Sequence, residues 1–308
     1  MENINNCKLT IITPYYNQRE TIEATILSVL NQSLKEIEYI VIDDGSTDGG
    51  IDIINKYSDK LTIIRQENKG QVKTQNYGWE IANGEYIGYL SSDDTLDSKC
   101  YETLVQYLDN SDEKVVLAFP QNHLIDIDSK IVKQNVTREF NLEETILTSE
   151  CFIGAGSIFK KAYFNKFGGW DNRYVIGSDR AYFIYMAQNF EIKLVPNAIA
   201  YYRYHSGSTV VYTKGAEKSL EYVRFLDVLF SDISYDKKFI SKSYSNAYFI
   251  VTINSFRNFE IINGFKYYIK SLRYDISKLS FKNCYLLIRR VTSRPIKGLL
   301  RRIKIIIK

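Results

Sequence analysis

Short apolar runs alternate with helical patterns along the N-terminal third of the chain, and this alternation restricts the fold most. The runs are rich in Ile, Val, Tyr and Thr, as buried strands are, and they occupy residues 8–13 (KLTIIT), 38–43 (EYIVID), 61–65 (LTIIR) and 85–90 (EYIGYL). Between them, apolar residues recur at helical spacing over 22–30 and 51–57. Strands that alternate with helices predict an α/β fold with a mostly parallel sheet. In GSTDGG, Ser46 or Thr47 is expected to cap the second helix.

Polar motifs follow three of these predicted strands at their carboxyl ends. The motifs are residues 13–17 (TPYYN), the pair Asp43 and Asp44, and the pair Asp93 and Asp94. Parallel strands bring their carboxyl ends to one edge of the sheet, where ligands bind in open α/β folds. Adjacent ionised carboxylates repel, so such a pair is most stable beside a cation or several donors. Taken alone, Asp93 and Asp94 fit a plain turn equally well, but the convergence of three motifs favours a ligand site.

The composition fits a soluble protein with a full core. A chain of 308 residues that is 45% hydrophobic and 25% charged suits one large or two modest domains. The four cysteines are far apart and form no CxxC pair, so they predict neither a zinc site nor a disulfide framework. The first residues, MENINNCKLT, lack the pattern of a secretory signal, and no apolar run approaches membrane-spanning length. We therefore expect a cytoplasmic protein.

The pattern changes toward the C-terminus. A strand-like VVLAFP begins at residue 115, and GGWDNRYVIGSDRAYF then carries Asp179 from a loop into an amphipathic helix. After the strand-like AIAYYRYH, residues 214–308 are helical in pattern. The predicted domains are therefore a catalytic domain over residues 1–212 and a helical region over residues 213–308.

Charge is distributed unevenly between these regions. After Asp275 the sequence holds ten Lys or Arg residues and no acidic residue, so residues 1–275 carry 30 basic against 36 acidic groups. The tail over residues 286–308 interleaves eight basic residues with Leu, Ile and Val. Such a tail can lie on an anionic membrane surface or pack on the acidic body, and both interpretations stay open. Nucleic acid is not expected as a partner, because no recognised motif accompanies the charge.

Five motifs together resemble the family 2 glycosyltransferases with the GT-A fold. They are TIITPYYNQRETIEATILSVLNQ, YIVIDDGSTDGG, NKGQVKTQNYGWEIANGEYIGYLSSDD, GGWD and YRYHSGSTV, which span roughly residues 8–210 in the order and spacing of the family. The resemblance implies a Rossmann-like, mostly parallel sheet flanked by helices, with a C-terminal helical extension. It also implies inverting transfer of a sugar from a nucleotide diphosphate donor, with Mn²⁺ or Mg²⁺ as cofactor.

The chemistry of a donor nucleotide assigns roles at the strand ends. Tyr15 could stack on the base and Thr13 could bond to it, while Asp43 or Asp44 could accept the N3 proton of uracil. The alternative is that Tyr15 belongs to the core and that the aspartate caps a helix. With the resemblance added, the expected nucleotide-sugar-binding residues are Thr13, Tyr15, Asn17, Glu20, Asp43, Asp44, Gly70, Gln75, Asn76, Asp93 and Arg203.

The resemblance implies a metal site at the sequence YLSSDD. Asp94 would hold the cation that bridges the diphosphate, and Asp93 would meet the ribose or the metal, since a hard dication prefers carboxylate and phosphate oxygens. The sequence departs from the frequent Asp-Ser-Asp-Asp by having Ser91 first. His205 in YRYHSGS is the second expected metal ligand, with a purely structural histidine as the alternative.

Asp179 corresponds to the catalytic base of the family. Inversion requires a base that deprotonates the acceptor hydroxyl as it attacks the anomeric carbon. Ser178 stands where the family usually has Glu, which could alter contacts with the acceptor. An N-cap role for Asp179 is compatible with catalysis. Trp170 and Asp171 would border the acceptor, although core packing explains Trp170 equally well.

Further departures from the family bear on the substrates. Gln75 replaces the usual Arg of Ala-Arg-Asn, so uridine is favoured but a dTDP-sugar stays in play. No Gln-x-x-Arg-Trp follows Asp179, so we expect one sugar added per encounter. The acceptor is a glycan or lipid-linked precursor of a surface polysaccharide, reached at the cytosolic face of the inner membrane if the tail binds there. A non-catalytic sugar-nucleotide or glycan-binding module is the alternative, and the oligomeric state is left open.

Overall fold

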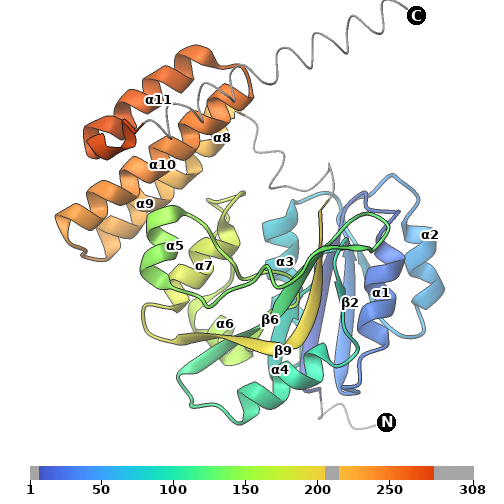
Figure 1. The fold of residues 1–308 in the computed structure, drawn as a ribbon. Helices are drawn as coiled ribbons and strands as arrows, with labels where there is room; N and C mark the ends of the chain where they lie inside the picture. The colour runs from blue at the N-terminus through green and yellow to red at the C-terminus, as the bar shows by residue number, and fades with distance from the viewer. Residues whose placement is uncertain (1–6, 205–214, 281–308) are drawn as a thin grey trace, which may run out of the picture. The chain divides into compact units, whose positions relative to one another are not determined.

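The predicted strands form the parallel half of one sheet in the computed structural model, which describes residues 7–204 and 215–280 (Figure 1). This half pairs β1 with β2 and β4, and β2 with β3, all in parallel. The strands are β1 (Leu9–Tyr15), β2 (Ile37–Asp43), β3 (Thr62–Arg65) and β4 (Tyr86–Tyr89). In the register, Tyr15 lies opposite Asp43 and Ile12 lies opposite Tyr89. The predicted polar motifs therefore meet at one edge, which we call the carboxyl edge.

Later strands extend the sheet with mixed directions. Within the described residues the nine strands run in the order β3-β2-β1-β4-β8-β6-β9-β5, and β7 pairs with β6. The added strands are β5 (Thr95–Leu96), β6 (Val115–Ile125), β7 (Ile131–Lys133), β8 (Ile158–Lys160) and β9 (Glu191–Arg203). The long β9 runs parallel to β6 and antiparallel to β5, with Tyr201 opposite Thr95. This pairing brings the end of β9 beside the turn that contains Asp94.

Helices cover both faces of the sheet, as the period-two alternation of strand residues requires. On β1, Leu9 and Ile11 join a core with Ile26, whereas Ile12 joins a second core with Trp79. The first face packs against α1 (Ile22–Leu30), α2 (Ile51–Ile54) and α4 (Cys100–Asp109). The second face packs against α3 (Gln71–Ile81), α6 (Lys161–Phe167) and α7 (Ser178–Met186). The sheet is therefore buried on both sides, and its polar chemistry is confined to the strand ends.

The chain divides into two compact units, which we call the sheet unit and the helical unit. The sheet unit contains the described residues up to Leu142 and from Cys151 to residue 204, and the helical unit contains Glu143–Glu150 and residues 215–280. The helical unit is built from α5 (Leu142–Thr148), α8 (Gly215–Ser219), α9 (Glu221–Asp232), α10 (Lys237–Arg257) and α11 (Ile261–Tyr274), followed by a short 3-10 turn, η3 (Ile276–Lys278). Asn246 Nδ2 of α10 donates to Leu147 O of α5 at 2.7 Å. No helix in the described part of the chain is long and apolar enough to cross a membrane.

The predicted cap of the second helix is wrong. α2 begins at Ile51 and continues into a 3-10 turn, η1 (Asn55–Tyr57), and its N-cap is Gly50 without a side-chain hydrogen bond. Ser46 and Thr47 instead contact the loop after β1, where Ser46 Oγ accepts from Asn17 N and Thr47 N donates to Asn17 Oδ1. The polar residues of GSTDGG are therefore used to join two loops at the carboxyl edge rather than to begin a helix.

Candidate active site

The Asp93–Asp94 turn is fastened to α1 by two buried threonines. Thr21 Oγ1 donates to Ser92 O at 2.9 Å, and Thr25 Oγ1 donates to Asp94 O at 2.8 Å. Because the two threonines are one helical turn apart, they hold successive parts of the turn between β4 and β5. The backbone of both aspartates is thus fixed by the fold before any ligand is considered.

Arg203 fastens the same turn from the other side. Its backbone N–H donates to Asp94 Oδ1 at 2.8 Å, and its Nε donates to Asp93 O at 2.7 Å. Its terminal nitrogens donate to Asp126 O, Ile127 O and Ser129 Oγ at 2.6, 2.9 and 3.0 Å. The side chain is only 1% exposed. Arg203 therefore lies beside the Asp93–Asp94 turn, and its guanidinium holds three backbone carbonyls and the Ser129 hydroxyl.

Asp94 is a buried carboxylate in an unfavourable electrostatic position. Burial raises the pKa of Asp94 well above its usual range, and the charge of Asp93 raises it further, while the hydrogen bond and charge of Arg203 lower it only in part. Oδ1 accepts the Arg203 N–H, whereas no described residue donates to Oδ2. An ionised Asp94 would be stabilised by a cation at Oδ2.

The predicted cation fits this donor set. Among residues 7–204 and 215–280, no group of three or more His, Cys, Asp or Glu side chains is placed to hold a metal ion. Mg²⁺ is often bound through only one or two carboxylates together with substrate phosphates. The oxygens of Asp94 and Asp93 match that type of site, in which the diphosphate completes the coordination. His205, the other predicted ligand, lies outside the described residues.

Asp43 and Asp44 hold the loop that precedes α3. Asp44 accepts from Gln66 Nε2 and Lys69 N through Oδ1 and from Gly70 N through Oδ2, at 2.8, 2.8 and 2.9 Å. The fully buried Asp43 accepts from Ser46 N at 2.9 Å and from Arg65 Nε at 3.1 Å. A carboxylate has about four acceptor positions, so each aspartate retains capacity for a ligand donor beyond these internal contacts.

Tyr15 and Thr13 belong to the interior. Tyr15 is fully buried, and its hydroxyl donates to Asp48 Oδ1 at 2.5 Å. Thr13 is also fully buried and bonds to the hydroxyl of Tyr39 at 3.0 Å. Tyr15 offers no exposed face to a base in this conformation, so the core interpretation describes its position. The loop after it is different, because Asn17 and Glu20 are both exposed.

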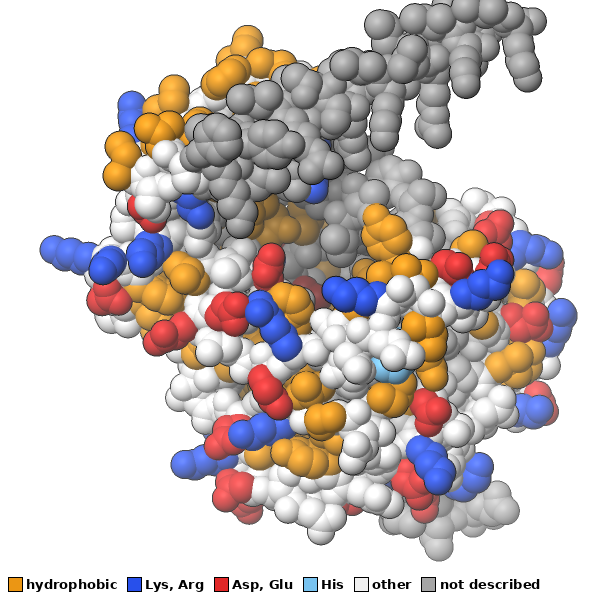
Figure 2. All heavy atoms as spheres, viewed as in Figure 1, with side chains coloured by type: hydrophobic (Ala, Val, Ile, Leu, Met, Phe, Trp, Pro, Cys, Tyr) orange, Lys and Arg blue, Asp and Glu red, His pale blue; other side chains and the backbone are white. Residues whose placement is uncertain are grey.

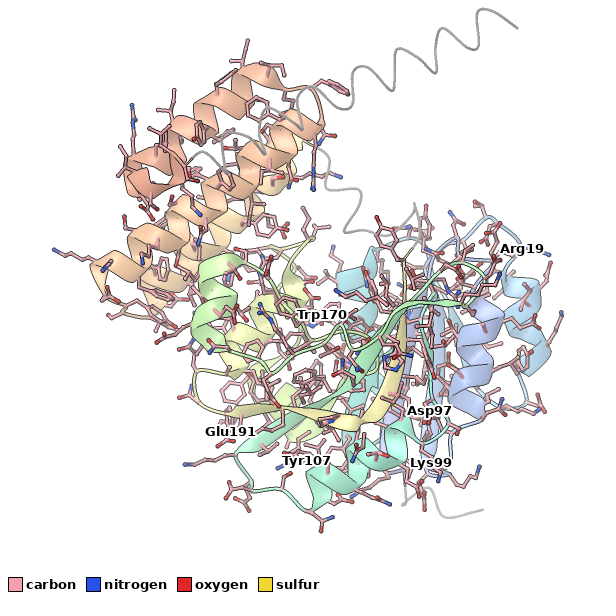
Figure 3. The ribbon with its side chains drawn as sticks, in the orientation of Figure 1. Arg19, Asp97, Lys99, Tyr107, Trp170 and Glu191 are labelled. Atoms are coloured by element: carbon pink, nitrogen blue, oxygen red, sulfur yellow. The ribbon has the colours of Figure 1, made fainter. Side chains whose placement is uncertain are left out.

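Asp48 links the loop after β1 to the loop after β2. Besides Tyr15, its carboxylate accepts from Arg19 N at 2.8 Å and from Gly50 N at 2.9 Å. Arg19 NH1 in turn donates to Gly49 O at 2.8 Å, at the outer end of the carboxyl edge beside α1 and α2 (Figure 3). The two loops therefore form one cross-linked structure.

Two residues of α3 have different roles: Asn76 supports the backbone at Trp170, and Gln75 is a candidate contact for a ligand. Asn76 holds the backbone of Trp170 at two points, because Oδ1 accepts from Trp170 N at 2.8 Å and Nδ2 donates to Trp170 O at 2.7 Å. Gln75 is fully buried, and neither atom of its amide has a hydrogen-bond partner among the described residues. Gly70, the N-cap of α3, has a positive φ of 85° that suits glycine. The unpaired amide of Gln75 is a polar group that a ligand or water can satisfy.

Trp170 and Asp171 border the segment that leads to Asp179. The Trp170 ring is 4% exposed and packs edge-on against Trp79 and Tyr89, with centroids 5.3 and 4.9 Å away, between the sheet and the helices α6 and α7 (Figure 3). Its Nε1 has no partner among the described residues. Asp171 forms an ion pair with Arg173 at 2.6 Å. Trp170 is therefore a core residue at this position, and Asp171 has a local partner.

Asp179 lies in the first turn of α7, after the N-cap Gly177. Its side chain is half-buried, and Oδ1 accepts from Arg180 N at 2.6 Å. The N-terminal end of a helix favours a negative charge, which suits a carboxylate that must be ionised to act as a base. The alternative of an N-cap role for Asp179 is wrong, because the helix begins at Ser178 and its N-cap is Gly177.

The charges of the predicted catalytic and metal-binding carboxylates act on the same two tyrosines. Burial raises the pKa of Tyr89, and the charges of Asp179 and Asp94 raise it further. Burial likewise raises the pKa of Tyr202, with further contributions from Asp94, Asp93 and Asp179. Tyr89 ends β4 and Tyr202 precedes Arg203 on β9. The charges of Asp94 and Asp179 therefore both reach these two rings.

Several of these contacts were not predicted from the sequence. The sequence gives one indication of the roles of Thr21 and Thr25. Both are hydroxyl residues, and they stand at helical spacing next to the apolar face of α1. Tyr202 and the Arg203 contacts depend on the pairing of β9 with β5, which no local pattern shows. The link between Asn76 and Trp170 joins residues 94 positions apart.

Comparison with known proteins finds glycosyltransferases. The family described as glycosyl transferase family 2 matches residues 10–170. A cholesterol galactosyltransferase of Borreliella burgdorferi is 39% identical over 114 residues, which are 35% of this chain and 32% of that protein. The UDP-Glc:alpha-D-GlcNAc-diphosphoundecaprenol beta-1,3-glucosyltransferase WfaP of Escherichia coli is 38% identical over 122 residues, 39% of this chain and 47% of that protein. The matched segment thus spans less than half of each relative.

Solved structures establish the fold over a larger part of the chain. S. aureus TarS 1-349 in complex with UDP-GlcNAc superposes with a TM-score of 0.65 at 16% identity, covering 92% of this chain and 87% of that chain. The mannosyltransferase PcManGT from Pyrobaculum calidifontis, in complex with GDP-Man and Mn²⁺, gives 0.58 at 17% identity, covering 95% and 82%. The fold is the GT-A fold that the motifs predicted. With its family match over more than half of its length, the chain belongs to family 2 of the glycosyltransferases.

Proposed function

We propose that this glycosyltransferase moves a sugar from a UDP-sugar to a hydroxyl group of a glycan or lipid-linked acceptor, with inversion at the anomeric carbon and one sugar per encounter. The product would be a precursor of a surface polysaccharide. Two of the similar proteins support the proposed substrates: WfaP acts on UDP-Glc and a diphosphoundecaprenol-linked sugar, and TarS 1-349 was solved with UDP-GlcNAc. A dTDP-sugar as donor is the second candidate, favoured by Gln75 in place of the usual arginine.

The observation that carries the proposal is the buried Asp94 beside Asp93. Its Oδ2 has no donor among the described residues, and burial together with Asp93 makes its ionised form unfavourable. Asp94 and Asp93 would hold Mn²⁺ or Mg²⁺, which when bound neutralises charge on the departing nucleotide diphosphate. The clamps from Thr21, Thr25 and the Arg203 backbone would keep the carboxylates in place throughout the reaction.

The chain's own residues supply the remaining steps. The carboxylate of Asp179 would accept the proton of the acceptor hydroxyl as that oxygen attacks the anomeric carbon. The helix start favours its ionised state. The loop held by Asn76 at Trp170 would position the acceptor beside this base. The buried amide of Gln75 would contact the donor.

Binding of the donor is tested by calorimetry with UDP, with and without Mn²⁺. Asp94→Asn should abolish the metal-dependent part of UDP binding while the fold is retained, because Asn Oδ1 can still accept the Arg203 N–H. Asp59→Asn, an exposed carboxylate on the same unit, is the matched control and should bind as the parent does. Equal UDP affinity of the parent with and without Mn²⁺ would refute the metal role.

Chemistry is tested separately from binding. Asp179→Asn keeps the size of the side chain but removes the base, so transfer from the UDP-sugar should fall by roughly 10² or more while UDP affinity changes little. Near-normal turnover would end the assignment of Asp179. A parent protein that binds UDP but neither hydrolyses nor transfers from any UDP-sugar would instead be a binding module.

A further inference from the structure

The helix α11 buries its small and polar residues and exposes its large aliphatic ones. Toward α10 it places Gly264, Tyr267 and Ser271, which are buried. Ser271 and Ser245 of α10 exchange side-chain to backbone hydrogen bonds at 2.8 and 2.9 Å. At Gly264 a Cβ atom would come within 2.5 Å of the Phe256 ring. The two helices therefore pack closely through residues that contribute little apolar area.

The outer side of α11 carries the apolar surface instead. Ile262 is 85% exposed, Phe265 58% and Ile269 52%. At 100° per residue, these three and Ile261 fall within one arc of about 100°. Exposed apolar residues continue past both ends of the helix at Phe259 and Ile276. Figure 2 shows hydrophobic side chains, in orange, along this side of α11 at the top of the view.

A row of cations lies next to this apolar row. Lys266, Lys270 and Arg273 follow it around the helix, and no acidic residue occurs between Ile261 and Tyr274. The Lys270 ammonium lies over the rings of Tyr248 and Tyr267, 5.2 and 5.6 Å from their centroids. The apolar and basic rows therefore share one exposed surface, which we call the α11 face.

The acidic residues at the two ends of α11 are used within the helical unit. Glu260 accepts from Ala216 N and from Asn263 Nδ2, both at 3.0 Å. Asp275 accepts from Ser277 N at 2.9 Å. Among the residues that the structure describes, neither carboxylate forms an ion pair with Lys266, Lys270 or Arg273. A contiguous exposed apolar row beside a row of cations is the pattern of a helix that lies in a membrane interface.

We propose that the α11 face docks on an anionic lipid surface. Three partners could cover the α11 face: a lipid surface, the chain's own C-terminal segment, or a second copy of the chain. The positive charge of the face favours the lipid surface. The chain after Asp275 holds ten Lys or Arg residues and no acidic residue, so its own C-terminal segment would add cations to cations. A second copy joined face to face would oppose two basic rows. Anionic headgroups neutralise the basic row while the interface takes up the apolar one.

The docking itself is independent of catalysis, but its purpose rests on the proposed function. A lipid-linked acceptor is presented at a membrane surface, and an enzyme held there by α11 would meet it at high local concentration. This role concerns described residues and does not require the basic tail over residues 286–308.

Vesicle co-sedimentation of the full chain tests the docking. The parent should pellet with vesicles of phosphatidylcholine and phosphatidylglycerol at low salt, and less at high salt. Ile262→Gln/Ile269→Gln should reduce the vesicle affinity at least about tenfold, since two buried aliphatic side chains are lost. Ile131→Gln/Val132→Gln removes two exposed aliphatic residues from β7 and should bind as the parent does. Equal binding of the α11 variant and this control would overturn the proposal.

Photo-crosslinking identifies what covers the face. Ile262→p-benzoylphenylalanine in the full chain should yield lipid adducts when irradiated with the same vesicles. Adducts to the segment 281–308, or to a second copy, as the main products would overturn the lipid assignment. UDP binding is measured on every variant. A parent protein that binds UDP but no vesicles contradicts only this inference, whereas a parent protein that binds vesicles but not UDP contradicts only the proposed function.

Discussion

The guanidinium of Arg203 donates four hydrogen bonds to protein acceptors at the carboxyl edge. It donates to Asp93 O and to three acceptors in the turn over residues 126–129, and it is nearly inaccessible to solvent. Five N–H donors in one plane can reach several acceptors at once, which a lysine ammonium cannot. At the residue scale, the edge is therefore organised by protein-to-protein hydrogen bonds.

Arg203→Lys should lower the free energy of unfolding by about 2–4 kcal/mol, because buried carbonyl groups lose their donors. UDP binding with Mn²⁺ should also weaken, since the Asp93–Asp94 turn loses one of its supports. Denaturant unfolding and calorimetry measure the two effects. The control is Arg65→Lys, whose side chain is 61% exposed and pairs with Asp43, so its effect should stay within about 1 kcal/mol. Similar losses for both variants would contradict a special role for Arg203.

Asp48 predicts a dependence of stability on pH. Burial acts to raise the pKa of Asp48, but hydrogen bonds from the Tyr15 hydroxyl and the N–H groups of Gly50 and Arg19 outweigh it and hold the pKa below its usual value. Its ionised form therefore stabilises the fold above the unfolded pKa of about 3.9, and this stabilisation is lost as the pH falls through the folded-state pKa.

Asp48→Asn should accordingly cost about 1–2 kcal/mol of unfolding free energy at pH 7, and less as the pH falls below about 4. Chemical denaturation over that pH range measures it. The exposed Asp52, changed to Asn, is the control and should show little difference at any pH. A cost that stays constant down to the lowest pH would show that the charge of Asp48 is not the stabilising feature.

At the scale of elements, the strands and their common edge could be predicted because each leaves a local pattern. Residues 8–13, 38–43, 61–65 and 85–90 each overlap one observed strand, and the observed ends differ from the predicted ends by at most two residues. The sequence could not show which polar side chains form hydrogen bonds that hold the fold together. Asp44 and Arg203 were predicted as ligand-binding residues on type and place, yet their present contacts are with the protein.

The link from α3 to the Trp170 loop gives a test at this scale. Gly169 has no room for a side chain, since a Cβ would come 2.2 Å from Asn76 Oδ1. Gly169→Ala and Asn76→Ala should each destabilise the protein by about 1–3 kcal/mol and raise KM for the acceptor more than for the donor.

Because both changes break the same contact, the double variant should cost clearly less than the sum of the two single changes. Thermal or denaturant unfolding of the four proteins completes the cycle. Additive losses would mean that Gly169 and Asn76 act independently, and an unchanged acceptor KM would separate the loop from substrate binding.

At the scale of the whole molecule, the predicted donor residues that the structure describes all belong to the sheet unit. UDP with Mn²⁺ should therefore slow amide hydrogen exchange in the turn over residues 91–94 and the loop over residues 66–70, and not in α10 or α11. A ligand at one hundred times its Kd stabilises the native state by about 2.7 kcal/mol, which exchange rates resolve. Uniform slowing across both units would contradict a site confined to the sheet unit.

The glycines of the second loop have a consequence for protein engineering. A Cβ at Gly50 would overlap the Tyr15 hydroxyl, and one at Gly49 would come 2.5 Å from the Arg19 guanidinium. Residues from two separate segments therefore interlock, so neither segment can be randomised alone without losing most library members to misfolding. Attempts to redirect donor preference by directed evolution should vary residues 15–19 and 46–50 together, or leave both fixed and diversify α3 around Gln75.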